Sequence, residues 1–222
     1  MRSRDGEVCL CKDYTGKPLW VRRLVTRRVL KHEYRVLTRL NDLSETPSAI
    51  SLDNPDILMM EYMDHALPLP DQRTCEAGFY PPLGFFHHLT RSVTAMHAHG
   101  VAHGDLRRKN ILYRPNSESP VLIDFATACT VPSSGSFLRR RLFDLMARMD
   151  LVTVLKIQAS YYPSSLNADQ RALLEDVPWC LRVGRFFRKN IYRRWLKRRK
   201  WRRRLDRWHQ RRPESATSHA RH

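Results

Sequence analysis

The stretch from Met96 to Ala128, MHAHGVAHGDLRRKNILYRPNSESPVLIDFATA, decides the fold of this chain. It holds Asp105 and Asn110, five positions apart in a polar loop, and Asp124, which directly follows the apolar run Val121–Ile123. Such a layout can direct one base and two metal ligands at a single point. Phosphoryl transfer requires this geometry, because its catalysis consists mainly of positioning and charge stabilisation.

The composition predicts a folded protein with one core or two small lobes, because the chain has 222 residues of which 42% are hydrophobic. No run of eighteen apolar residues occurs, and the first residues, MRSRDGE, lack the apolar segment of a secretory signal. The five cysteines include no C-x-x-C pair and indicate reduced thiols rather than a zinc site. We therefore expect a cytoplasmic protein.

Most of the net charge of +18 belongs to one segment, because residues 181–212 hold sixteen Lys and Arg and a single acid. Aromatic residues interleave with these cations and would form one stripe of a helix, which predicts an interfacial helix on an anionic membrane. Binding to nucleic acid and packing against the rest of the protein remain alternatives. Pro213 ends the pattern, and we expect residues 213–222 to be disordered.

The first third of the chain predicts a strand, a helix and a second strand. Residues 6–14 form a short apolar strand pattern with Lys12 where the pattern breaks, and helical spacing over Val25–Leu40 places Glu33 inside a helix. Residues 43–55 are typical of a loop that contains a short apolar run, Ile50–Leu52. The apolar run 57–63, interrupted by Glu61, predicts the second strand, and a proline-rich stretch follows it.

The remainder of the chain predicts mainly helices. Apolar residues recur every three or four positions from Leu83 to His99, and Gly100 is placed to end that helix. Further helices are predicted over Phe137–Lys156 and over Ala168–Leu174, the latter with Asn167 as its N-cap.

Taken together, these features resemble the protein-kinase-like superfamily, in its atypical branch of RIO-like kinases, aminoglycoside-phosphotransferase-like enzymes and kinases of lipopolysaccharide core sugars. The resemblance runs from about Gly6 to Ala128. It implies an α+β, two-lobe fold with a truncated N-lobe sheet (1–66) and a mainly helical C-lobe (67–180), followed by the basic helix (181–212) and the disordered end (213–222).

The resemblance also implies a site for ATP. In the family a strand lysine pairs with a helix glutamate and holds the nucleotide phosphates, which assigns these roles to Lys12 and Glu33. The strand that leads to the interlobe linker resembles residues 57–63, so the backbone from Glu61 to Met63 would meet the adenine.

The loop motif H-x-D-x-x-x-x-N is matched by His103, Asp105 and Asn110. The resemblance implies that Asp105 is the catalytic base, that Asn110 and Asp124 bind Mg²⁺, and that Arg107 neutralises charge on the transferred group. His103 is expected to hold the loop by hydrogen bonding.

Two departures from the family pattern bear on function. Only eleven residues precede Lys12, with Gly6 as their single glycine, so they contain no glycine-rich loop to cover the phosphates. Either the true start lies upstream of Met1, or the protein covers its nucleotide without that loop, or it has lost activity. No A-P-E element is found, which favours a sugar or glycolipid acceptor over a peptide. We expect a kinase that phosphorylates a protein hydroxyl or a lipopolysaccharide core sugar. The alternative is a pseudokinase scaffold that binds membrane or RNA through its basic tail.

Overall fold

The computed structural model describes residues 2–4, 7–73, 80–131 and 137–175. Residues 1–174 form one compact unit, and residues 175–222 form a second unit, of which only Glu175 is described. The predicted basic helix over 181–212 and the disordered end over 213–222 therefore lie outside the described residues. Within the described part, no helix is long and apolar enough to cross a membrane.

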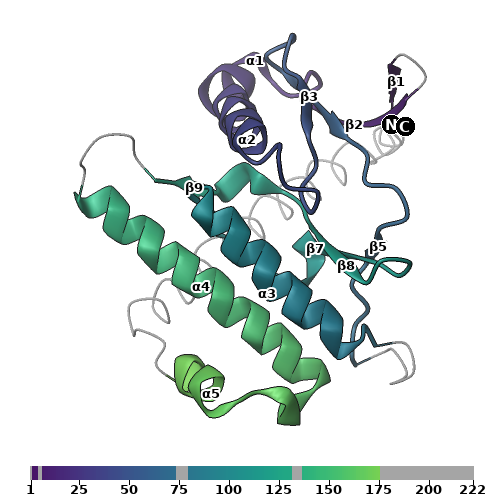
Figure 1. The fold of residues 1–222 in the computed structure, drawn as a ribbon. Coiled ribbons are helices and arrows are strands. Elements are labelled where there is room, and N and C mark those ends of the chain that lie inside the picture. Colours follow the sequence, from purple (N-terminus) through teal and green to yellow (C-terminus); the bar gives the residue numbers. More distant parts are fainter. Residues whose placement is uncertain (1, 5–6, 74–79, 132–136, 176–222) are drawn as a thin grey trace, which may run out of the picture. The chain divides into compact units, whose positions relative to one another are not determined.

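The fold is mixed, with a small antiparallel sheet next to a mainly helical part, as expected (Figure 1). The sheet has the strand order β1-β2-β4-β3 and is formed by β1 (Arg2–Arg4), β2 (Glu7–Asp13), β3 (Ala49–Ser51) and β4 (Ile57–Glu61). Strand β2 lies between β1 and β4, and Lys12 is paired with Leu58. A hairpin thus precedes Lys12, although its turn at residues 5–6 is not described.

The structure corrects the start of one predicted helix and adds a short strand to this region. The helix predicted over Val25–Leu40 begins earlier, as α1 (Leu19–Val21), continues through a π-helical turn at Arg22–Thr26 and ends as α2 (Arg27–Arg39). Its first two turns present apolar side chains to solvent, so they lack the buried stripe on which a periodicity argument depends. Within the predicted loop at 43–55, the backbone next to and within the short apolar run Ile50–Leu52 pairs with β4 and forms strand β3.

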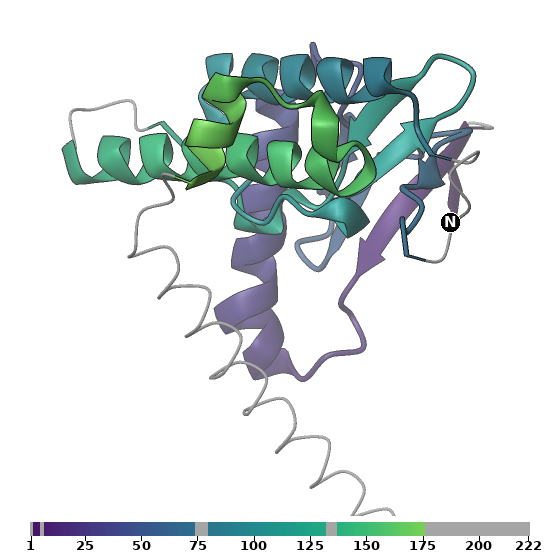
Figure 2. The ribbon, with the colours of Figure 1, turned by 90° about the horizontal axis from the view of Figure 1, so that it is seen from below.

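The helical part is built on α3 (Leu83–Ala98) and α4 (Phe137–Tyr161), followed by α5 (Ala168–Glu175). Helices α3 and α4 lie side by side, and α2 runs crosswise to them (Figure 2). Gly100 follows α3 with φ +68°, a conformation suited to glycine, and its N–H donates to His97 O at 2.8 Å. Helix α4 continues five residues beyond the predicted end at Lys156, and Asn167 caps α5 through Gln170 N at 2.8 Å.

Short strands hold the loops between the helices. They are β5 (Leu67–Pro68), β6 (Val101–Ala102), β7 (Ile111–Arg114), β8 (Ser119–Leu122) and β9 (Cys129–Thr130), with single 3₁₀ turns at Arg108–Asn110, Phe125–Thr127 and Pro163–Ser165. The hairpin of β7 and β8 separates the two loops that carry Asn110 and Asp124. One hydrophobic core joins the sheet to the helices and includes Leu30, Met60, Phe85 and Phe125. The lobe boundary after Ala66 remains a prediction.

Candidate active site

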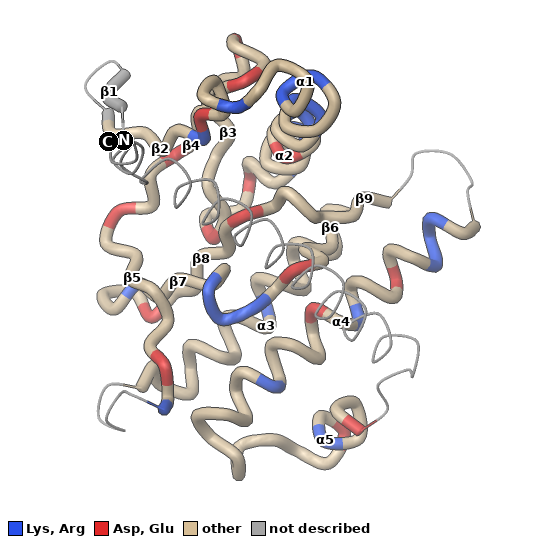
Figure 3. Tube along the Cα trace, turned by 180° about the vertical axis from the view of Figure 1, so that it is seen from behind, with Lys and Arg blue, Asp and Glu red and all other residues tan. Residues whose placement is uncertain are grey.

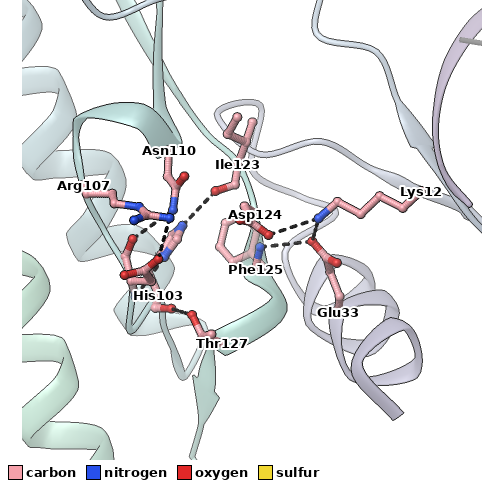
Figure 4. Close-up of polar contacts among 10 residues, drawn as sticks. Lys12, Glu33, His103, Arg107, Asn110, Ile123, Asp124, Phe125 and Thr127 are labelled. Carbon is pink, nitrogen blue, oxygen red and sulfur yellow. Dashed lines mark hydrogen bonds and ion pairs between the residues drawn. The ribbon is translucent and has the colours of Figure 1, made fainter. Parts of the chain in front are cut away.

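Lys12 and Glu33 form an ion pair that links the sheet to α2 (Figure 4). The distance from Lys12 Nζ to Glu33 Oε1 is 2.6 Å, and the Glu33 side chain is only 1% exposed. Burial by itself would lower the pKa of Lys12, but the attraction and hydrogen bond of Glu33, and then of Asp124, outweigh it and raise the pKa above its usual value. Lys12 is therefore a fixed positive charge at neutral pH.

Asp124 lies on the other side of the same lysine. Its Oδ1 is 3.1 Å from Lys12 Nζ, and its backbone has φ +70°, a left-handed conformation that non-glycine residues rarely adopt. The next N–H, of Phe125, donates to Glu33 Oε1 at 3.2 Å. Glu33 thus fixes Lys12 and the backbone beside Asp124 at once. Its second oxygen, Oε2, is buried and accepts no hydrogen bond from any residue that the structure describes.

The loop before β7 carries Asp105, Arg107 and Asn110. Asn110 Nδ2 donates to Asp105 O at 2.9 Å, which turns the amide oxygen of Asn110 away from that carbonyl. The guanidinium of Arg107 is 3.1 Å from the Asp105 carboxylate. Arg107, Arg108 and Lys109 form a basic run in this loop, and Arg108 is held by Asp71 at 2.5 Å. Figure 3 shows a continuous basic stretch close to β7 and β8.

His103 holds the loop, as the sequence predicted. Its side chain is fully buried, and its Nε2 lies 3.0 Å from the carbonyl of Ile123, so Nε2 carries the proton. Its Nδ1 then accepts from Asp105 N at 3.4 Å, and the ring packs on Phe125 at 4.9 Å between ring centres. His103 therefore connects the loop of Asp105 to the segment that carries Asp124.

Sequence reasoning missed Asp150, a buried carboxylate on α4. It accepts from the backbone N–H of His103 at 2.7 Å and of Gly104 at 3.2 Å, and His97 Nε2 lies 3.2 Å away. The sequence contained a signal for this role, because Asp150 falls at helical spacing from Phe143 and Val154, which lie on the buried face of α4. A charged residue within an apolar stripe indicates a buried polar partner.

A pocket of about 590 Å³ is lined by five of the eight predicted site residues, whereas Glu33, Asp105 and Arg107 are not among its lining residues. Lys12, Asn110 and Asp124 line one part of it, and apolar side chains, among them Leu10, Met60, Leu112 and Ile123, line the rest. Glu61 and Met63 also line the pocket. The Glu61 carboxylate accepts from Ser48 N at 3.0 Å, so a planar ligand at this edge would meet the backbone of this segment rather than a free carboxylate.

The residues at the polar part of the pocket fit a magnesium ion. The Asn110 amide oxygen and the Asp124 carboxylate are hard oxygen ligands, and two protein ligands suffice when substrate phosphates and water supply the others. Asp124 is 46% exposed despite its contact with Lys12, so its carboxylate is open to a ligand.

This arrangement of a small sheet, a lysine–glutamate pair, a basic loop and a left-handed aspartate is that of a protein-kinase-like fold. A family model described as RIO domain matches residues 15–149, more than half of the chain. The chain therefore belongs to the RIO family. The match includes Glu33, Asp105 and Asp124, whereas Lys12 precedes it by three residues and Asp150 follows it by one.

Among solved structures, the chain is similar to the Rio2 kinase of Chaetomium thermophilum, determined as an ADP/Mg²⁺-phosphoaspartate complex. The two share 18% sequence identity with a TM-score of 0.48, over 74% of this chain and 48% of that one. The chain thus spans about half the length of the kinase it matches. No curated protein has significant sequence similarity to it.

Proposed function

We propose that this protein is an ATP- and Mg²⁺-dependent phosphotransferase that acts on a hydroxyl group. The observation that carries the proposal is the convergence of Lys12, Asn110 and Asp124 on one pocket, with Asp105 on the adjoining loop. Membership of the RIO family supports the same chemistry.

In this proposal the apolar part of the pocket holds the adenine and Lys12 binds the phosphates as a point charge. Asn110 and Asp124 would hold Mg²⁺, which would neutralise phosphate charge during transfer. Asp105 accepts the proton of the acceptor hydroxyl while the hydroxyl oxygen forms a bond to the γ-phosphorus of ATP. The bond between that phosphorus and the bridging oxygen breaks, and ADP leaves. Arg107, 3.1 Å from Asp105, offsets negative charge on the transferred group.

The acceptor is proposed to be a protein serine or threonine, or a sugar of the lipopolysaccharide core. Exposed Arg107 and Lys109 beside Asp105 suit an acceptor that carries negative charge. We further propose a cytoplasmic location, with residues 181–212 peripheral on an anionic membrane. Anionic vesicles should retain the full chain more strongly than a chain truncated before Leu181, and equal retention would contradict the membrane contact of residues 181–212.

The decisive experiment measures ATP binding and ATP turnover separately in the purified full chain, with lipopolysaccharide or protein as acceptor. Asp105→Asn should abolish phosphoryl transfer and retain nucleotide binding, whereas Asp124→Ala should lose Mg²⁺-dependent binding. The exposed Asp42→Asn serves as the matched control. ATP binding without turnover in the unmodified chain would support the pseudokinase scaffold instead. Turnover that survives both variants would refute the assigned site.

A further inference from the structure

The start of the long N-terminal helical stretch exposes an unusual group of apolar side chains. Leu19, Trp20, Leu24 and Val25 are each between 51% and 62% exposed, although they lie within two turns of one helix. Exposed apolar residues that are scattered need no explanation, but four on one short element form a contiguous surface.

Cations are interleaved with these apolar residues along the sequence. Residues 14–32 include six Lys and Arg and no Asp or Glu. Arg22 and Arg27 bind the buried Asp56. The other four, Lys17, Arg23, Arg28 and Lys31, are exposed and form no ion pair with any described residue. Figure 3 shows basic residues on α1 and the start of α2.

Buried contacts on the inner side fix the orientation of this surface. Arg27 binds Asp56 through two hydrogen bonds of 2.8 Å, and Arg22 contacts the same carboxylate. Asp56 is only 1% exposed, so this cluster anchors the helix to the turn before β4. The π-helical turn at Arg22–Thr26 includes one of the two arginines that bind Asp56. Such turns occur often at functional sites. The outward side chains are therefore presented by a rigid element.

Charge decides which partner this surface can take. The basic segment 181–212 carries a net charge of +15, so the cations of this surface repel it. A second copy of the chain is repelled as well, because it would bring the same cations face to face. A nucleic acid would satisfy the cations, yet it would leave three exposed aliphatic side chains without an apolar environment. An anionic bilayer satisfies both groups, because aliphatic and indole side chains enter the interface while cations meet the headgroups.

We propose that Leu19, Trp20, Arg23, Leu24, Arg28 and Lys31 form a lipid-docking face that binds the surface of an anionic phospholipid bilayer. This contact is separate from the one proposed for residues 181–212, and it does not depend on phosphotransferase activity. Glu33 lies on the same helical stretch as the face, so a docked membrane would contact the element that positions Lys12.

The test uses the full chain with Trp179, Trp195, Trp201 and Trp208 changed to Phe, which leaves Trp20 as the single indole. Vesicles of phosphatidylglycerol and phosphatidylcholine that carry brominated acyl chains should quench and blue-shift Trp20 emission, whereas vesicles of phosphatidylcholine alone should not. If the protein sediments with the anionic vesicles while Trp20 emission is unchanged, the face does not meet lipid and the proposal is overturned.

Two further variants test the composition of the face in the otherwise unmodified chain. R23Q/R28Q/K31Q should weaken vesicle binding about tenfold, since each cation near an anionic surface contributes a modest electrostatic attraction. R139Q/R140Q/R141Q, three exposed cations on α4, is the matched control and should bind nearly as the parent does. Equal losses in both variants would indicate non-specific charge attraction. A Trp20 shift with RNA but not with vesicles would also overturn the lipid assignment.

Discussion

The backbone N–H of His103 donates to the carboxylate of Asp150 at 2.7 Å, across forty-seven positions of sequence. This bond attaches the loop of Asp105 to α4, the longest helix in the described part of the chain. The same carboxylate accepts from Gly104 at 3.2 Å. The position of Asp105, the proposed base, is therefore set by Asp150, which does not line the pocket.

Removal of this carboxylate should destabilise the fold. In Asp150→Ala, the backbone N–H groups of His103 and Gly104 lose their acceptor, and each loss should lower the free energy of unfolding by about 1–3 kcal/mol. The Tm should fall by roughly ten degrees, and Asp150→Asn, which retains one acceptor oxygen, should lose less. Thermal unfolding measures the effect, with exposed Asp144→Ala on the same helix as control. Identical Tm values for both alanine variants would contradict this role.

Gly104 should tolerate no side chain. Its φ is +74°, and a Cβ would lie 2.7 Å from Thr127 O and 2.8 Å from Met146 Cε. Gly104→Ala should therefore lower the free energy of unfolding by at least about 1–3 kcal/mol, from backbone strain alone. Gly16→Ala is the control, because a Cβ there meets nothing within 4 Å. Denaturant unfolding of the two variants tests the difference, and equal midpoints would contradict the loop geometry.

Glu33→Gln should weaken nucleotide binding more than it weakens the fold. The amide keeps the size of the side chain but removes the charge that faces Lys12 at 2.6 Å. Lys12 would then pair with Asp124 alone, and we expect at least a tenfold loss in ATP affinity, equivalent to about 1.4 kcal/mol. Calorimetric titration with ATP and Mg²⁺ measures it, with exposed Glu175→Gln as control. Unchanged affinity would show that the ion pair does not organise the site.

Asp56 should make stability depend on acid pH. The hydrogen bonds from Arg27 and then Arg22 hold the pKa of its carboxyl well below the usual range. Because the unfolded value is about 3.9, this contribution is complete above that pH and is lost as the pH falls through the lower, folded pKa.

Asp56→Asn should therefore lose stability at pH 7 and show a weaker further loss between pH 5 and pH 2 than the parent does. Urea unfolding across this range measures the difference. Exposed Asp42→Asn is the control and should follow the parent curve. A parallel curve for Asp56→Asn would show that this ion cluster does not govern acid unfolding.

The sequence alone predicted the order of the main elements and five of the residues that line the candidate pocket, namely Lys12, Glu61, Met63, Asn110 and Asp124. Asp105, Asn110 and Asp124 sit at fixed spacing around a hairpin, and local turn and strand preferences suffice to predict such a unit. Lys12 and Glu33 could be paired only through the family resemblance, because nothing local connects a strand to a helix twenty-one positions later.

Tertiary structure alone decided three features. Asp150 anchors the loop because packing places α4 beneath it, and a buried carboxylate requires donors that only the folded chain supplies. Helix α1 forms without a buried stripe, since Asp56 binds Arg22 and Arg27 from a distant turn. Asp124 adopts its left-handed backbone beside Lys12 of β2 and Glu33 of α2, whose contacts outweigh the local preference against that conformation.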